Sequence, residues 1–214
     1  MRLNAFFYKS FWSPRNKQSV KVHLGPGQEK YINGWINVDS NIFTAKIDVW
    51  ADLKNPLPFS NETVDCFYSH HMVEHLPDIE RHFCEVYRCL KPGGVYRVAG
   101  PNGDSAAQKL TANDFAWFEQ HSHFPEDRSS IGGKLNNFLM CKGEHVHVLT
   151  LSFLTELLIS TGFIDIFLCK PVQETYYPAF FQECLATENE SDFDTPHTIV
   201  VEAYKPLINA QTKL

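Results

Sequence analysis

Short apolar runs rich in β-branched and aromatic residues recur in the first third of the chain, and each ends next to a glycine, an aspartate or a histidine. They cover residues 20–24, 35–39, 46–53 and 64–69. The last run is apolar on both faces at its centre, which is typical of a strand that is covered on both sides. The pattern predicts four short strands separated by turns.

The spacing of apolar residues changes from that of a strand to that of a helix after Asp78. This aspartate follows Pro77 and predicts a helix N-cap. Lys91-Pro92-Gly93-Gly94 predicts the end of the helix and a turn into a further strand at 95–101. The apolar face of the helix carries Ile79, Phe83, Val86, Tyr87 and Leu90.

The same alternation continues in the last third of the chain. A second helix is predicted from a cap at Ser152 to Gly162, and strands are predicted at 163–169 and 198–204. The acidic stretch at 173–196 between these two strands predicts an exposed loop. Strands that alternate with helices predict an α/β fold with a doubly wound, mostly parallel sheet.

The 214 residues, of which 43% are hydrophobic, are typical of one globular domain. We expect this domain at 20–206, with an insertion at about 105–150. Residues 1–19 form a basic and aromatic arm, which we expect to be a lid folded over the domain. Contact with a membrane surface or a grip on an anionic substrate are the alternatives for this arm.

Charge and composition narrow the class of protein. A net charge of −6 argues against a nucleic-acid partner, because binding phosphates needs a basic face. The start of the chain lacks an apolar core typical of a secretion signal, and no apolar run approaches the roughly 18 residues that span a bilayer. The six cysteines contain no C-x-x-C pair and predict buried free thiols. We therefore expect a cytoplasmic protein.

Residues suited to binding a nucleoside follow four successive predicted strands. Gly25-Pro26-Gly27 lets a ligand approach the backbone, Asp39 can accept hydrogen bonds from a ribose diol, and Asp52 can accept one from an exocyclic amine. Ser69 and His70 follow the fourth strand. Ligands of doubly wound sheets bind beyond the carboxyl ends of the strands. The four positions together predict a site for a nucleoside-bearing cofactor.

Four segments resemble the successive motifs of class I S-adenosylmethionine-dependent methyltransferases. They are "VHLGPGQEKYINGWINVD", "ADLKNPLPFSNETVDCFYSHHMVEHLPD", "VYRCLKPGGVYRVAGPN" and "VVEAYKP". The resemblance is dense over residues 20–104 and looser over 145–206. Within the family it is to the short-loop branch, whose sequences contain "GWINVD". It implies a Rossmann-like, seven-stranded sheet with an antiparallel last strand, and S-adenosylmethionine as the cofactor. The cofactor-binding residues that it implies are Gly25, Pro26, Gly27, Asp39, Ser40, Asp52, Leu53, Ser69 and His70.

Two positions depart from the pattern of that family. His23 stands where many methyltransferases have an acidic residue, so the amino group of the cofactor needs another partner. Asp39 follows Gly25 by only fourteen positions, against about 20 in the usual dinucleotide fingerprint. The first crossover helix is therefore expected to be abbreviated.

The string "HHMVEHLPD" carries a second interpretation. His71, Glu74 and His75 spell H-x-x-E-H, a zinc hydrolase pattern that needs both histidines on one helical face. Pro77 leaves little room for that helix, and a third ligand would have to come from Glu80 or Glu85. In methyltransferases a similar "EHL" follows the fourth strand. His71 and His75 are then the candidates for a general base in methyl transfer. Positioning of the two reactants is expected to contribute more to the rate than a base does.

The insertion at 105–150 is aromatic and rich in histidine and is expected to bind the methyl acceptor. It contains two H-x-H pairs, His121 with His123 and His145 with His147. These pairs either line an acceptor pocket as polar side chains or bind a metal ion together. The acidic charge and modest size favour a small-molecule acceptor, such as a sugar or a secondary metabolite, methylated on oxygen or nitrogen. A protein or lipid-linked acceptor, a protein that binds S-adenosylmethionine without catalysis, and a homodimer remain open alternatives.

Overall fold

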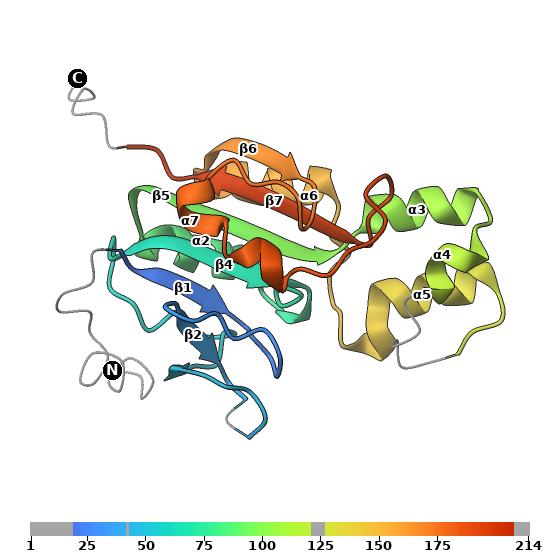
Figure 1. Ribbon diagram of the computed structural model, residues 1–214, viewed down its shortest axis with the longest axis horizontal. Coiled ribbons are helices and arrows are strands. Elements are labelled where there is room, and N and C mark those ends of the chain that lie inside the picture. Colours follow the sequence, from blue (N-terminus) through green and yellow to red (C-terminus); the bar gives the residue numbers. More distant parts are fainter. Residues whose placement is uncertain (1–18, 42, 121–126, 208–214) are drawn as a thin grey trace.

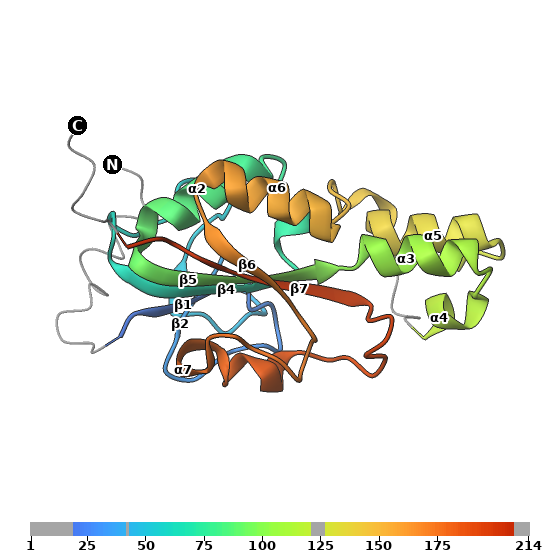
Figure 2. The same ribbon diagram turned by 90° about the horizontal axis from the view of Figure 1, so that it is seen from above.

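The computed structural model describes residues 19–41, 43–120 and 127–207. Residues 1–18 of the predicted arm at 1–19, and the pair His121 and His123, lie outside these residues. The described chain forms a seven-stranded sheet with helices on one face and an irregular segment on the other (Figures 1 and 2).

The sheet has the order β3-β2-β1-β4-β5-β7-β6. Strands β1 to β5 run parallel, whereas β7 is antiparallel to both β5 and β6. This confirms the predicted fold class, including the antiparallel last strand. The strands are β1 Lys21–Leu24, β2 Ile36–Asp39, β3 Val49–Trp50, β4 Val64–His70, β5 Leu90–Pro101, β6 Ile164–Cys169 and β7 Thr198–Tyr204.

Helices α2 (Ile79–Cys89) and α6 (Leu151–Thr161) cover one face of the sheet (Figure 2). Asp78 caps α2 by accepting a hydrogen bond from the Arg81 N–H, as predicted. The predicted Ser152 cap of α6 is wrong. Thr150 is the extended residue before the helix, and its hydroxyl accepts the Phe153 N–H over 3.2 Å, which leaves Ser152 inside the first turn.

The connection between β1 and β2 contains turns in place of a crossover helix. The Asn37 side chain holds this loop from within. Its carboxamide oxygen accepts the Ile32 N–H, and its nitrogen donates to the carbonyl oxygens of Ile32 and Trp35. The short spacing between Gly25 and Asp39 therefore leaves a loop without a helix, and the buried side-chain amide of Asn37 holds this loop in place.

The opposite face of the sheet is covered by the segment between β6 and β7, which contains α7 (Pro178–Phe181) and the 3-10 helix η4 (Cys184–Thr187). Phe181 packs there against Trp35 and Tyr68. The expectation of an exposed acidic loop is wrong for Glu188. Its carboxylate pairs with the buried guanidinium of Arg97, and it is only 7% exposed because that pair is formed inside the protein.

Helices α3 (Gly103–Thr111), α4 (Phe115–Glu119) and α5 (Ile131–Met140) form a lobe beyond the carboxyl end of β5 (Figures 1 and 2). Trp117, Phe118 and Phe138 form a separate apolar cluster inside it. The 3-10 helix η3 (Cys141–Gly143) leads back to the sheet. None of the helices in the described ranges is long and apolar enough to cross a membrane. The six cysteines are free, and four are buried.

Candidate active site

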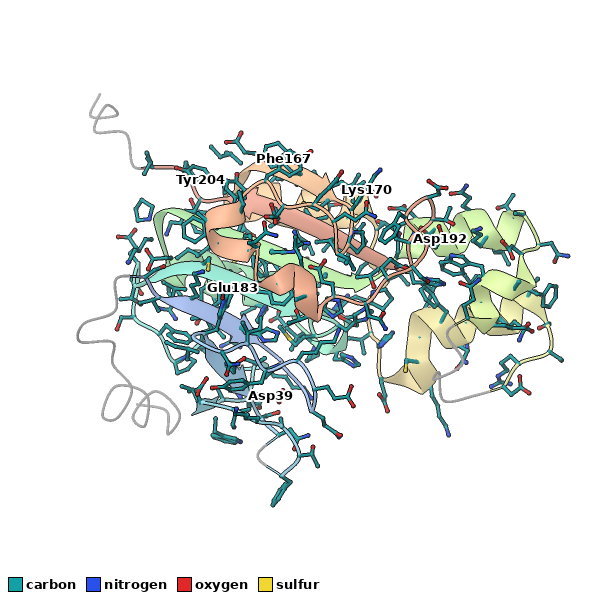
Figure 3. The ribbon with its side chains drawn as sticks, in the orientation of Figure 1. Asp39, Phe167, Lys170, Glu183, Asp192 and Tyr204 are labelled. Atoms are coloured by element: carbon teal, nitrogen blue, oxygen red, sulfur yellow. The ribbon has the colours of Figure 1, made fainter. Side chains whose placement is uncertain are left out.

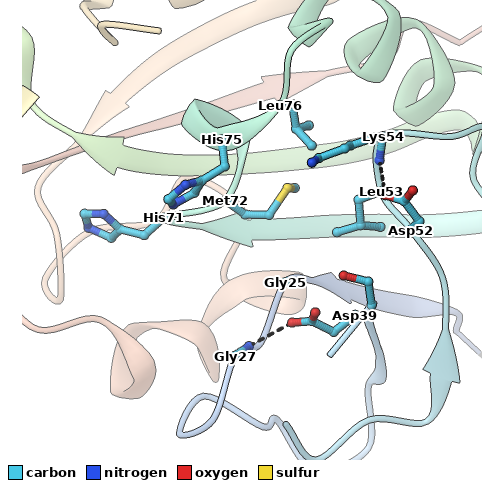
Figure 4. A pocket seen from close by; sticks show the side chains of 11 residues that line it. Gly25, Gly27, Asp39, Asp52, Leu53, Lys54, His71, Met72, His75 and Leu76 are labelled. Carbon is cyan, nitrogen blue, oxygen red and sulfur yellow. Dashed lines mark hydrogen bonds between the residues drawn. The ribbon is translucent and has the colours of Figure 1, made fainter. Parts of the chain in front are cut away.

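The carboxyl ends of β1, β2, β3 and β4 meet at one edge of the sheet and enclose a cavity of about 250 Å³ (Figure 4). They meet because the four strands are parallel and adjacent. This edge is where doubly wound sheets bind their ligands. The cavity is lined by Gly25, Gly27, Asp39, Ser40, Asp52, Leu53, Lys54, His71, Met72, His75 and Leu76.

Gly25 occupies a position that only glycine suits. Its φ is +71°, in the left-handed region. A Cβ atom here would lie 2.5 Å from Cγ of Met72. The missing side chain therefore lets Met72 pack against the loop that follows β1 and shapes the wall of the cavity.

Two carboxylates are held at this edge by their own neighbours. Asp39 accepts the N–H groups of Gly27 and Asn41 over 3.1 and 2.9 Å. Asp52 accepts the N–H of Lys54 and the side-chain amide of Asn55 over 3.1 and 2.8 Å. Each carboxylate oxygen has a second acceptor site. Both groups are therefore oriented in advance and can still accept hydrogen bonds from a ligand.

A larger cavity of about 570 Å³ adjoins the first. It extends from the loop after β1 toward the helical lobe and the start of β7. Most of its lining residues carry polar or titratable side chains, and five of them are histidines. The residues are Gly25, Pro26, Gly27, Gln28, Glu29, Lys30, His70, His71, Glu74, His75, Phe138, Cys141, His145, Asn189, His197 and Thr198.

His71 and His75 line both cavities, together with Gly25 and Gly27. His75 belongs to the 3-10 helix η2 (Val73–His75), directly after the end of β4. Figure 4 shows both imidazoles on the segment that follows this strand. The two predicted catalytic residues therefore stand at the junction of the two cavities.

His71 has a left-handed backbone, with φ of +51°, which is uncommon outside glycine. Its N–H donates to the carbonyl of Ala99 in β5 over 2.9 Å. Its Nε2 atom lies 3.1 Å from the Thr198 hydroxyl, and its Nδ1 atom lies 3.4 Å from Glu74 Oε1. Such strain concentrates at functional sites. Here it directs the ring between β7 and Glu74.

The remaining predicted cofactor residues lie in different places. Pro26 and His70 line the larger cavity, whereas Ser69 lines neither, because its hydroxyl is hydrogen-bonded to the buried Tyr96 hydroxyl over 2.8 Å. His70 Nδ1 lies 3.0 Å from Lys30 Nζ. Burial, followed by neighbouring positive charge, holds the pKa of His70 well below its ordinary value. The ring is therefore neutral, and its Nδ1 atom can accept a hydrogen bond from the Lys30 ammonium group.

The H-x-x-E-H string does not form the helical motif that a zinc hydrolase of that type needs. Its last three residues make the single turn η2, and the left-handed His71 stands outside it. Of the two expected third ligands, Glu85 accepts the Leu57 N–H and pairs with Arg88, and Glu80 is exposed at the start of α2. Neither belongs to the two cavities.

Sequence reasoning missed Lys30, Asn189, His197 and Thr198, which come to the larger cavity from distant parts of the chain. Thr198 could have been found. Because β7 is antiparallel to β5, its first residue pairs with Pro101 at the end of β5 and reaches the same edge of the sheet. Asn189 and His197 belong to the irregular segment before β7, for which no periodic pattern predicts a position.

Comparisons with known proteins add a partial sequence match and a shared fold. Residues 14–98 match the family model described as a methyltransferase domain. No curated protein matches the chain significantly. The fold is similar to that of an S-adenosylmethionine-dependent methyltransferase of Thermotoga maritima, named as a possible histamine N-methyltransferase. That likeness has a TM-score of 0.53 and 17% identity over 94% of this chain and 87% of the other.

Two further solved structures share the fold. One is an S-adenosylmethionine-dependent methyltransferase of Mesorhizobium loti, with a TM-score of 0.50 and 18% identity over 86% of this chain and 90% of the other. The second is phosphoethanolamine N-methyltransferase 2 of Haemonchus contortus in complex with S-adenosylmethionine. It gives a TM-score of 0.52 and 15% identity over 95% of this chain and 52% of the other.

The sequence match covers the first part of the chain, over residues 14–98, and the fold of the described residues is that of class I methyltransferases. The assignment to the short-loop "GWINVD" branch stays a prediction.

Proposed function

We propose that the protein transfers the methyl group of S-adenosylmethionine to an oxygen or nitrogen of a small molecule, with the cofactor in the smaller cavity and the acceptor in the larger one. The observation that carries this proposal is that His71 and His75 line both cavities. Methyl transfer is an in-line displacement, so donor and acceptor must meet at one point. The junction beside these histidines is that point.

In this arrangement Gly25 and Gly27 lie against the methionine part of the cofactor, and Asp39 with Ser40 binds the ribose. Asp52 and Leu53 then lie beside the adenine. The connected positions of these residues around one cavity support this assignment. His70 and Pro26 face the acceptor side, where they border the reacting groups.

The lining of the larger cavity favours a small polar acceptor. Its volume of about 570 Å³ lies within the range of roughly 300 to 1,000 Å³ that is usual for small-molecule sites. Lys30, Asn189 and Thr198 offer hydrogen-bonding groups, and Phe138 adds an apolar side. A polyhydroxylated molecule such as a sugar, or a polar secondary metabolite with one ring, fits this mixture.

His71 is the group best placed to accept the proton of the acceptor. Its Nε2 atom faces the hydroxyl of Thr198, at the position that an acceptor hydroxyl could take. Glu74 on the opposite side of the ring favours a hydrogen on Nδ1, so Nε2 carries the lone pair, which can accept a hydrogen bond from the Thr198 hydroxyl or from an acceptor hydroxyl in its place. His75, in η2, borders the same junction beside His71.

The proposal is tested by incubating the protein with S-adenosylmethionine and a panel of sugars, amines and phenols, and by measuring S-adenosylhomocysteine. We expect turnover with at least one small acceptor and its loss when the larger cavity is blocked by Thr198→Trp. Binding of S-adenosylmethionine without turnover on any member of a broad panel, or turnover that Thr198→Trp leaves intact, would contradict it.

A further inference from the structure

Three side chains beside the larger cavity present atoms that bind metal ions. They are Glu74, His75 and His145, and one carboxylate or imidazole atom of each lies within 4.8 Å of the other two. Glu74 and His75 belong to η2, whereas His145 follows η3 at the end of the helical lobe. The cluster therefore joins the sheet to the lobe.

Backbone hydrogen bonds fix the two segments against each other. The Val146 N–H donates to the carbonyl of Glu74 over 2.8 Å. His147 Nε2 lies 2.9 Å from the carbonyl oxygen of Leu76, so this ring donates to the backbone and does not join the cluster. The members of this H-x-H pair consequently have different roles.

Both histidines of the cluster are held in the tautomer that a metal ligand needs. His75 Nδ1 lies 3.0 Å from the carbonyl oxygen of Glu144, and His145 Nδ1 lies 3.0 Å from that of Leu139. A carbonyl oxygen only accepts hydrogen bonds, so each Nδ1 carries the hydrogen and each Nε2 has a free lone pair. This backbone contact is typical of histidines that bind metals.

Glu74 is the strongest indication of a missing partner. Its side chain is fully buried, and among the described residues Oε2 has no hydrogen-bond partner and Oε1 has only long contacts to imidazole nitrogens. The nearest ring nitrogens are His71 Nδ1 at 3.4 Å and His75 Nε2 at 4.0 Å. A buried, ionised carboxylate is costly unless it is paired or bound to a metal.

The neighbouring strand makes room for the carboxylate. A Cβ atom on Gly100 of β5 would lie 3.2 Å from Glu74 Oε2 and would also collide with Leu149. Gly100 therefore lets the Glu74 side chain reach its buried position between η2 and the sheet.

We propose that Glu74, His75 and His145 bind a divalent transition-metal ion at the edge of the larger cavity. Two imidazoles and one carboxylate favour zinc, iron(II), cobalt or manganese over magnesium and calcium. Three protein ligands leave at least one coordination position open, as in catalytic sites.

The role of the ion rests on the function proposed above. An ion held here faces the cavity assigned to the acceptor and can bind an acceptor hydroxyl, whose pKa it would lower. The acceptor class is then narrowed to molecules with a hydroxyl or carboxylate oxygen close to the methylated atom.

The test is titration of chelator-treated protein with Zn²⁺ by calorimetry, together with the absorption spectrum of the Co²⁺-loaded protein. We expect one tight site per chain. Glu74→Gln and His145→Gln should each weaken it by at least about 100-fold, because changes in outer-shell partners alone cost about 10- to 100-fold. His147→Gln is the matched control and should leave the affinity within a few fold.

Binding of S-adenosylhomocysteine is measured on every variant and separates the outcomes. A variant that still binds it is folded, so a loss of Zn²⁺ affinity then reports on the ligand. Zn²⁺ affinity that is unchanged in Glu74→Gln and His145→Gln, or the absence of saturable Zn²⁺ binding in a protein that binds S-adenosylhomocysteine, overturns the metal site alone. Failure to bind S-adenosylhomocysteine in a Zn²⁺-binding protein instead overturns the proposed function.

Discussion

The Gly27 N–H donates a hydrogen bond to Oδ2 of Asp39 over 3.1 Å and joins the loop after β1 to the end of β2 (Figure 4). The other oxygen of Asp39 accepts the Asn41 N–H. Asp39 lies at the edge of the sheet far from the helical lobe (Figure 3). One side chain thus organises two strand ends around the smaller cavity.

Asp39→Ala should weaken S-adenosylhomocysteine binding by roughly 1 to 3 kcal/mol, because the ribose hydroxyls lose a charged partner. The dissociation constant from calorimetry measures this loss. Glu80→Ala, on the exposed face of α2, is the control and should leave the affinity unchanged. Equal affinities for both variants would place the ribose elsewhere.

Gly25→Ala should cost more stability than Gly34→Ala. Both glycines have a left-handed backbone, which costs an alanine about 1 to 2 kcal/mol. Only at Gly25 would the added Cβ also collide with Met72, whereas nothing lies within 4 Å of it at Gly34. Urea unfolding measures the free energy of each variant. We also expect weaker cofactor binding for Gly25→Ala alone, and equal effects at the two positions would argue against the close packing of Met72.

His71→Gln should lower kcat by about 10²- to 10⁴-fold, the usual contribution of a general base. The dissociation constant of S-adenosylhomocysteine should change only a few fold, because the cofactor is held mainly by the strand ends. Steady-state kinetics with an identified acceptor, alongside calorimetry, separates the two effects. Full activity in this variant would remove His71 from the reaction.

Glu188→Gln should destabilise the fold by about 3 to 5 kcal/mol, because it leaves the buried Arg97 guanidinium without one of its two carboxylates. Glu119→Gln breaks the exposed pair with Lys134 and should cost no more than about 1 kcal/mol. Chemical unfolding of both variants provides the comparison. Similar losses would mean that the segment over the sheet is held by its apolar contacts instead.

The free energy of unfolding should fall as the pH drops from about 6.5 toward 4, partly because of His23. Burial is the main cause that lowers the pKa of His23 to about 4. The unfolded state binds the proton first, so this contribution is complete above pH 6.5 and is lost as the pH falls toward 4. Its full size is roughly 3 kcal/mol. His23→Asn should reduce the pH slope, and an unchanged slope would contradict it.

Much of the fold follows from local sequence patterns. The apolar runs and the Asp78 cap predicted the strands and α2, because periodicity and capping depend on neighbouring residues. The Ser152 cap was wrong because two hydroxyl residues lie close together, and the choice of Thr150 depends on which of them is extended. The burial of Glu188 could not be predicted, since its partner Arg97 lies ninety-one positions away.

The two halves of the site differ in the same way. The residues proposed for the cofactor follow parallel strands, so the topology alone brought Gly25, Asp39 and Asp52 to one edge. The acceptor side is assembled from the lobe, η2 and the start of β7. Glu74 and His145 were visible only as parts of separate strings, and their contact depends on how the lobe returns to the sheet.

The most direct test of a cofactor site at this edge is the melting temperature with and without saturating S-adenosylhomocysteine. Ligand at about 100 times its dissociation constant adds roughly 2.7 kcal/mol, which should raise the midpoint by about 5 to 10 °C in a domain of this size. We predict a shift of that order. An unchanged midpoint at millimolar ligand would contradict a cofactor site formed by Gly25, Asp39 and Asp52.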